Sequence, residues 1–137
     1  MDDDQDDSSS AIPSHVLRTF RNSRTSNFRF YHLDTAICPL DDNTAIYFPK
    51  AFDEDGQNEL KKHLELIPVE ESEAEKFACN SVVIGKNVIM NQGSVKIAKV
   101  LVERGYKVHF VAMSEYLKSG GSAKCLTLRL DFDWYKK

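Results

Sequence analysis

The segment SVVIGKNVIMNQGSVKIAKVLVERGYKVHFV, residues 81–111, contains three short apolar runs and one longer amphipathic stretch. Its first two runs, residues 81–84 and 88–90, are rich in valine and isoleucine and are separated by the Gly-Lys-Asn sequence of residues 85–87. Short β-branched runs on both sides of a glycine-containing turn are typical of a β-hairpin. The start of the segment therefore predicts two antiparallel strands.

The second half of the same segment predicts a helix followed by a strand. Residues 95–104 carry apolar side chains at helical spacing, Ser94 stands at the N-cap position, and Gly105 follows as a C-cap. The run KVHFV, residues 107–111, then has the composition of a strand. Together with the hairpin, this order predicts a ββαβ module.

An earlier part of the chain repeats this pattern. The sequence AIYFPKAF aligns with VIMNQGSV at an offset of roughly forty residues, a scale typical of structural repeats. The first module is predicted to contain strands 28–35 and 44–48, a turn at 41–43, a helix at 55–64 and a strand at 66–69. Because such repeats seldom bury their apolar faces alone, two modules predict an incomplete α/β architecture.

Composition limits the class of protein. The chain has 137 residues, 42% of them hydrophobic, which suffices for one core. Its formal net charge of −3 gives no general basic surface, so we expect no nucleic-acid partner. The apolar runs are too short for a membrane helix, and we expect no membrane association. The three cysteines suggest neither a disulfide framework nor a zinc site.

The N-terminal sequence differs from the rest. Residues 1–27 begin with MDDDQDDSSS, an acidic and serine-rich tract that we expect to be disordered, and residues 14–24 can form one short helix. This tract lacks the features of a secretory signal, so we expect a cytoplasmic protein. The predicted domain comprises residues 28–137.

The sequence KSGGSAKCLTLRL, residues 118–130, places a cysteine after two glycines. On an extended chain Cys125 would share one face with Thr127 and Arg129, and the three leucines would occupy the other. A cysteine that avoids the apolar face is a candidate reactive thiol. Taken alone, the pattern favours an ordinary strand that follows a flexible turn.

A second candidate group lies in FRFYHLDT, residues 28–35. If this segment is a strand, period two places His32 and Asp34 on the same face. Alone, the pair also fits the polar end of a half-exposed strand. Together with Cys125 it supplies a nucleophile, a group for proton transfer and a carboxylate.

Three stretches resemble a known family: FYHLDTAICPL (30–40), ACNSVVIGKNVIM (78–90) and MSEYLKSGGSAKCLTLRL (113–130). They are similar to the C-terminal part of the arginine deiminase and dimethylarginine dimethylaminohydrolase group, guanidino-modifying and amidinotransferase-related enzymes of the pentein superfamily. The resemblance covers about residues 28–130. It implies a propeller of five ββαβ modules around a substrate channel, of which this chain would supply about two modules and a terminal strand.

The resemblance also implies roles for five residues. Cys125 would attack the guanidinium carbon, and His32 would act as general acid and base. Asp34 would hold guanidinium nitrogens, while Ser119 and Gly120 would bring backbone close to the substrate. Neither a metal nor an organic cofactor is expected.

The resemblance leaves two functions open. The first is a cysteine-dependent hydrolase, deiminase-like or dihydrolase-like, that acts on arginine or an arginine derivative as a fragment or shortened member. The second is a catalytically incompetent pentein remnant that acts as a protein-interaction domain. Self-association, or pairing with the missing N-terminal modules, is expected because two modules leave strand edges and apolar helix faces uncovered. The family also places further acidic substrate-binding residues in those modules, so the site of this chain is expected to be incomplete. Asn80, within the motif ACN, is expected to serve the channel or a turn and not catalysis.

Overall fold

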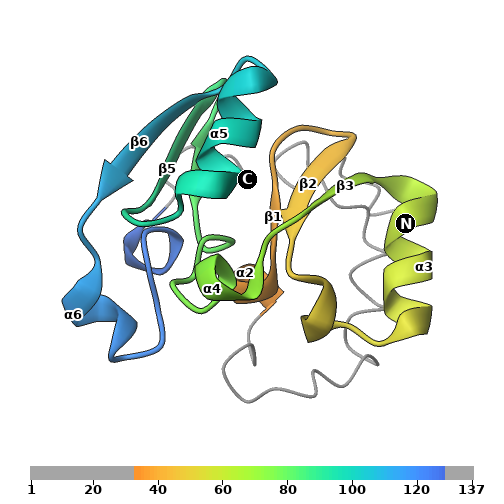
Figure 1. The fold of residues 1–137 in the computed structure, drawn as a ribbon, viewed down its shortest axis with the longest axis horizontal. Coiled ribbons are helices and arrows are strands. Elements are labelled where there is room, and N and C mark those ends of the chain that lie inside the picture. The colour runs from red at the N-terminus through yellow and green to blue at the C-terminus, as the bar shows by residue number, and fades with distance from the viewer. Residues whose placement is uncertain (1–32, 129–137) are drawn as a thin grey trace, which may run out of the picture.

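The computed structural model describes residues 33–128 and contains two three-stranded sheets (Figure 1). The first sheet belongs to a module of one short helix, a hairpin, a 3-10 turn, a longer helix and a strand. Its elements are α2 (Leu33–Ala36), β1 (Ile37–Pro39), β2 (Thr44–Tyr47), η2 (Pro49–Ala51), α3 (Glu54–His63) and β3 (Glu65–Pro68).

The second module follows the short helix α4 (Glu71–Ala74) and repeats the same order. It contains β4 (Val82–Ile84), β5 (Asn87–Asn91), α5 (Val95–Glu103) and β6 (Lys107–Val111). The helix α6 (Ser114–Leu117) and the 3-10 helix η3 (Lys124–Leu126) complete the described part of the chain. In residues 33–128 no helix has the length and apolar character that crossing a membrane requires.

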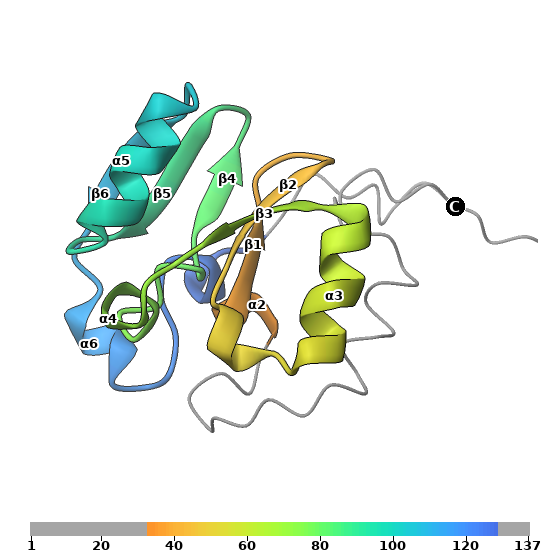
Figure 2. The same ribbon diagram turned by 45° about the vertical axis from the view of Figure 1, so that its right-hand side comes forward.

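Both sheets have the topology that the sequence predicts. In each, the first two strands are antiparallel, and the third strand pairs in parallel with the second after a helical crossover. Figure 2 shows α3 beside the first sheet and α5 beside the second. The prediction of two ββαβ modules is confirmed. The strands of residues 33–128 form two separate sheets, so the five-module propeller stays a prediction.

The predicted first strand, residues 28–35, is wrong where the structure describes it. Residues 33–36 form the helix α2, and the first strand of the hairpin is β1; residues 28–32 lie outside the described part. Ile37 and Cys38 of β1 are both buried, so this strand shows no alternation of apolar and polar residues. The alternating pattern of residues 28–35 is a stronger strand signal than the short apolar run of β1, so the sequence placed the first strand too early in the chain.

The predicted strand through Cys125 is also wrong. Residues 124–126 form the 3-10 helix η3, and the two described leucines of the predicted apolar face are exposed, Leu126 by 54% and Leu128 by 82%. The physical reason is that the backbone N–H of Cys125 donates to the side chain of Asn80 and not to a neighbouring strand. The buried Asn80 side chain thus accepts the hydrogen bond that a neighbouring strand would accept if Cys125 belonged to a sheet.

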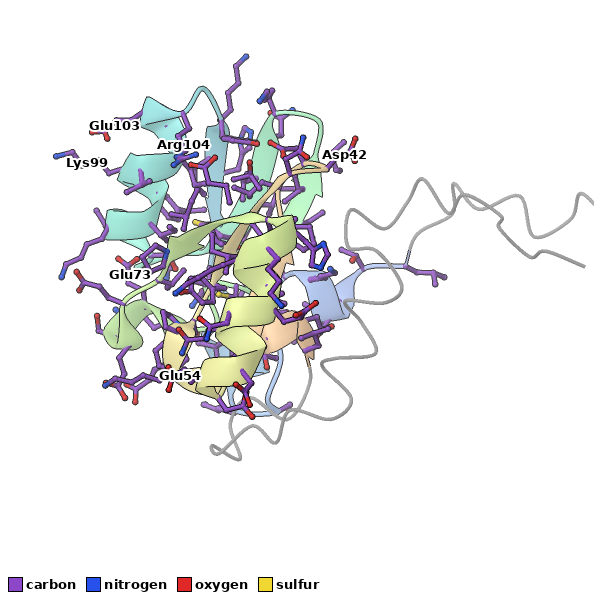
Figure 3. The ribbon with its side chains drawn as sticks, turned by 90° about the vertical axis from the view of Figure 1, so that its right-hand side faces the viewer. Asp42, Glu54, Glu73, Lys99, Glu103 and Arg104 are labelled. Atoms are coloured by element: carbon purple, nitrogen blue, oxygen red, sulfur yellow. The ribbon has the colours of Figure 1, made fainter. Side chains whose placement is uncertain are left out.

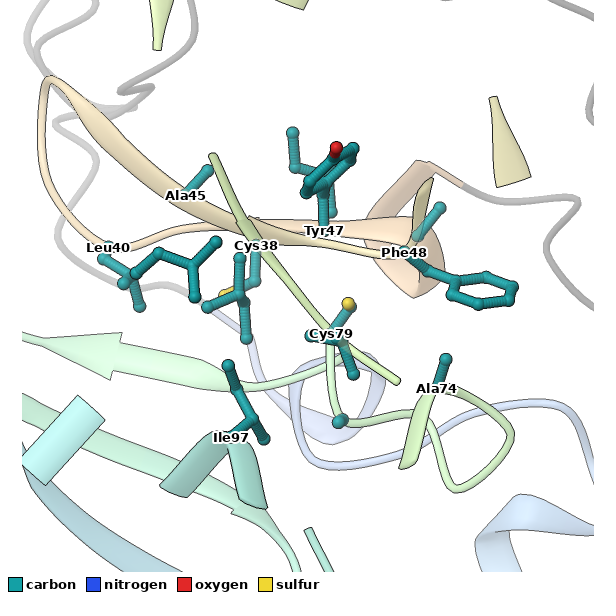
Figure 4. Close-up of a cluster of buried hydrophobic side chains, with 14 of the residues drawn as sticks. Cys38, Leu40, Ala45, Tyr47, Phe48, Ala74, Cys79 and Ile97 are labelled. Carbon is teal, nitrogen blue, oxygen red and sulfur yellow. The ribbon is translucent and has the colours of Figure 1, made fainter. Parts of the chain in front are cut away.

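One apolar core joins the two modules. Cys38 of the first module belongs to the same buried cluster as Cys79, from the following segment, and Ile97 of α5, all three labelled in Figure 4. Cys38 and Cys79 are buried, and burial raises the pKa of the Cys38 thiol to about 11 and that of the Cys79 thiol well above its usual value. These two thiols therefore serve packing.

Polar contacts also link the modules. Arg104, labelled in Figure 3, lies 2.6 Å from the Glu65 carboxylate, and the Tyr106 hydroxyl donates to Asp41 Oδ2 at 2.8 Å. Burial of Tyr106 and its hydrogen bond to the Asp41 carboxylate raise the pKa of this phenol to about 12.

This contact predicts a loss of stability at alkaline pH. An unfolded tyrosine titrates near pH 10, whereas folded Tyr106 keeps its proton up to a pKa of about 12. The folded state then binds more protons, so the free energy of unfolding is expected to fall as pH rises from 10 toward 12. Urea unfolding across this range tests the expectation, because Tyr106→Phe should show a shallower fall. Equal slopes in the two proteins would contradict it.

Candidate active site

The structure brings two of the predicted site residues together. The Cys125 Sγ lies 3.9 Å from Asp34 Oδ2, although the two residues are 91 positions apart. Cys125 belongs to η3 and is exposed, and Asp34 belongs to the first turn of α2. A solvent-accessible thiol beside a carboxylate can attack a cation that the carboxylate holds.

Asp34 has an oxygen available for a ligand. Within residues 33–128 its Oδ1 is buried without a hydrogen-bond partner. Buried carboxylate oxygens normally accept hydrogen bonds, so an oxygen without a donor indicates a place where a ligand can supply one. A planar guanidinium carries several N–H donors in a fixed arrangement and fits this need.

Hydrogen bonds and a glycine contact shape the loop before Cys125, and the predicted approach of Ser119 and Gly120 to a substrate stays a prediction. The N–H groups of Ser119 and Gly120 donate to the carbonyl oxygens of Tyr116 and Leu117 and so close the turn after α6, where Gly120 has a φ of 85°. Gly121 is the glycine in contact with the cysteine. A Cβ at this position would lie 3.1 Å from Cys125 Cβ and 3.5 Å from its Sγ. The loop therefore needs Gly121 to leave room for the thiol side chain.

Asn80 is the residue whose importance the sequence understated. Its side chain is fully buried and is bonded both to the cysteine loop and to the backbone of Asp34. The ACN motif did mark the position, but the prediction of a channel or turn residue did not identify these partners. The available signal was an asparagine directly after the apolar residues Ala78 and Cys79, because a polar side chain in an apolar stretch needs hydrogen-bond partners.

His32 lies outside the described residues, so its predicted role stays a prediction. Among residues 33–128 no group of three histidine, cysteine or acidic side chains is arranged to hold a metal ion. His63 and His109 are exposed; His63 contacts Glu59, and His109 contacts Asn87.

We expect Cys125 to react first with thiol reagents. It is exposed, whereas Cys38 and Cys79 are buried, and burial raises the pKa of both of these thiols. Because the thiolate is the reactive form, iodoacetamide should label Cys125 in the folded protein ahead of the other two. Peptide mass spectrometry at short labelling times measures this order. Equal labelling of all three cysteines in folded protein would contradict it.

Comparison with known proteins gives homologous sequences, although no protein-family model matches the chain. The chain is 44% identical over 105 residues to the bifunctional arginine dihydrolase/ornithine cyclodeaminase ArgZ of Synechocystis sp.. It is 41% identical over 103 residues to the N(G),N(G)-dimethylarginine dimethylaminohydrolase of Mycobacterium tuberculosis. Each match covers 74% of this chain, but only 15% of ArgZ and 34% of the mycobacterial enzyme.

A solved structure is similar as well. The N-terminal domain of cyanobacterial ArgZ, an arginine dihydrolase bound to its substrate, superposes with a TM-score of 0.74 and 42% sequence identity. This match covers 78% of the chain and 41% of the ArgZ domain, so the chain spans less than half of these relatives. Over 74% of its length, the chain is therefore a homologue of the arginine dihydrolases and dimethylarginine dimethylaminohydrolases, the guanidino-modifying enzymes of the pentein group.

Proposed function

We propose that the chain carries the nucleophile half of a cysteine-dependent hydrolase that acts on the guanidino group of arginine or an arginine derivative. The observation that supports this proposal most is the 3.9 Å approach of the Cys125 thiol to the Asp34 carboxylate, whose other oxygen has no partner within residues 33–128. The homologous enzymes act on arginine or dimethylarginine, which agrees with the same ligand class.

In the proposed reaction, Asp34 accepts N–H groups of the guanidinium and places its central carbon near the Cys125 sulfur. The thiolate forms a C–S bond to this carbon, and a C–N bond then breaks. His32 donates the proton that the departing amine takes, and afterwards removes a proton from water. The water oxygen replaces the sulfur at the carbon, which frees the thiolate and leaves a ureido product. Ser119 and Gly120 are proposed to shape the loop at the substrate.

The test is an assay of the 137-residue chain with L-arginine and with N(G),N(G)-dimethylarginine, which measures released amine and ureido product together. Ureido product formed in a one-to-one ratio with the first amine supports hydrolysis at the guanidino carbon. Amine released without a ureido product or its breakdown products would point to different chemistry. An inactive chain whose Cys125 shows no preference for amidine reagents would contradict the proposal.

A second function, a protein-interaction domain, has its own support. Large apolar side chains of the second module are exposed, among them Ile84 of β4, Val95 and Val102 of α5, and Phe110 of β6. Exposed apolar groups on strands and helices favour association. We propose that these side chains contact either further modules or a second copy of the chain. The proposed location of the protein in the cell is the cytoplasm. Sedimentation of the purified chain distinguishes a self-associating protein from a monomer.

A further inference from the structure

We infer that Asn80 is the positioning residue that fixes Cys125 relative to Asp34, an inference that rests on the proposed use of this thiol and this carboxylate. The two residues come from distant parts of the chain, and a thiol and a carboxylate need a common support to keep their separation. Asn80 contacts the backbone on both sides of the pair and is fully buried.

On the cysteine side, both oxygens of Asn80 accept hydrogen bonds from the loop. The side-chain Oδ1 accepts the N–H of Ser122 at 3.0 Å and the N–H of Cys125 at 3.2 Å. The backbone carbonyl oxygen accepts the N–H of Lys124 at 3.2 Å. Three amides of the segment 122–125 thus converge on one residue, which gives the loop its turn and places η3 at the site.

On the carboxylate side, the Asn80 amide acts as a donor. Its Nδ2 donates to the backbone carbonyl oxygen of Asp34 at 2.9 Å. An amide side chain offers an acceptor and a donor on one planar group, whereas an ionised aspartate lacks the donor and alanine lacks both. The amide plane therefore sets how far the Asp34 backbone stands from the Cys125 backbone.

This arrangement has a consequence for a cationic ligand. If Asp34 holds a planar cation, the distance from the cation to the sulfur depends on the Asn80 amide. Displacements of about 1 Å in reacting groups can cost on the order of 10²-fold in rate. Loss of Asn80 should slow attack on a cation bound at Asp34 much more than attack on a neutral reagent from solution.

Two alkylating reagents measure this difference without any need for turnover. Chloroacetamidine is a planar cation whose chloride the Cys125 thiolate displaces, and iodoacetamide is its neutral counterpart, which loses iodide. The alkylation ratio is the rate constant for chloroacetamidine divided by the rate constant for iodoacetamide, both at Cys125. In the folded wild-type protein this ratio should exceed the ratio in urea-denatured protein. In Asn80→Ala the ratio should fall by about tenfold or more. Asn80→Asp should also lower it, because this variant lacks the donor to Asp34.

Asn91 offers a matched control. It is another buried asparagine that bridges backbone groups: its Nδ2 donates to the Lys76 carbonyl oxygen at 3.2 Å, and its Oδ1 accepts the N–H of Met113 at 3.1 Å. Asn91→Ala should lower the free energy of unfolding, because it leaves the Lys76 carbonyl oxygen and the Met113 N–H without their hydrogen-bond partner. It should leave the ratio of alkylation rates unchanged. A ratio that falls equally in both alanine variants would mean a general structural role and would overturn the inference.

Amide hydrogen exchange, followed by NMR, tests the same contacts directly. In the wild-type chain the amides of Ser122 and Cys125 should be protected. In Asn80→Ala their exchange should accelerate more than that of Lys124, whose acceptor is the Asn80 backbone and survives the substitution. Where neither Asn80 variant folds, the wild-type measurement decides alone: protection of both amides supports the inference, and rapid exchange in folded protein overturns it.

The outcomes also separate this inference from the proposed function. A wild-type alkylation ratio equal to that of denatured protein contradicts cation binding at Asp34, and hence the proposed function, while amide exchange still decides whether Asn80 holds the loop. An elevated wild-type ratio that Asn80→Ala retains overturns the positioning role and leaves the proposed function supported.

Discussion

Cys125→Ser is expected to lower any guanidino hydrolysis by about a thousandfold or more in kcat, while the fold is retained. Removal of a nucleophile typically has an effect of at least this order, because a serine hydroxyl is a far weaker nucleophile than a thiolate without a base arranged to activate it. The fold should survive, since the Cys125 side chain is exposed and its N–H, which donates to Asn80, belongs to the backbone.

The measurement compares initial rates with arginine and with dimethylarginine for wild type, Cys125→Ser and Cys79→Ala. Cys79→Ala is the control because it also removes one thiol, but from the core. Circular dichroism and urea unfolding check that each variant is folded. Wild-type turnover by a folded Cys125→Ser protein would remove this residue as the nucleophile.

Glu73→Ala is expected to lower the free energy of unfolding by about 2–4 kcal/mol, because two charge-assisted hydrogen bonds disappear in a buried position. Glu73, labelled in Figure 3, is 4% exposed, and its two oxygens accept the N–H of Lys96 at 2.6 Å and of Ile97 at 2.9 Å. These amides are in the first turn of α5, where a negative charge also interacts favourably with the helix dipole. Glu73, which belongs to α4, therefore caps the N-terminus of α5.

Urea unfolding of Glu73→Ala beside Glu71→Ala gives the comparison. Glu71 is in the same short helix but forms an exposed ion pair with Lys50, at 2.6 Å, so its loss should change the free energy of unfolding by less than about 1 kcal/mol. Glu73→Gln should recover part of the stability, because its amide oxygen still accepts one N–H. Equal effects of the two alanine substitutions would contradict the capping role.

The N-terminus of α5 was predicted from the sequence only in part. Ser94 was correctly predicted at the N-cap position, yet its hydroxyl has no hydrogen-bond partner within residues 33–128, and the helix amides bond to Glu73 instead. A serine before an apolar stripe is a local signal that a sequence displays directly. A carboxylate that arrives from 23 or 24 positions upstream has no such signal, because only the packing of α4 beside α5 brings it there.

The sequence by itself determined the two ββαβ modules, since apolar periodicity, turn residues and caps act over a few neighbouring residues. It also singled out Cys125 and Asp34, through residue types and motif resemblance. Only the tertiary structure decided that Cys125 sits in a 3-10 helix and that Asn80 joins its loop to Asp34. The physical reason is that backbone amides removed from water must find acceptors, and the amides of Ser122 and Cys125 find theirs in the side chain of Asn80, 42 and 45 residues earlier in the chain.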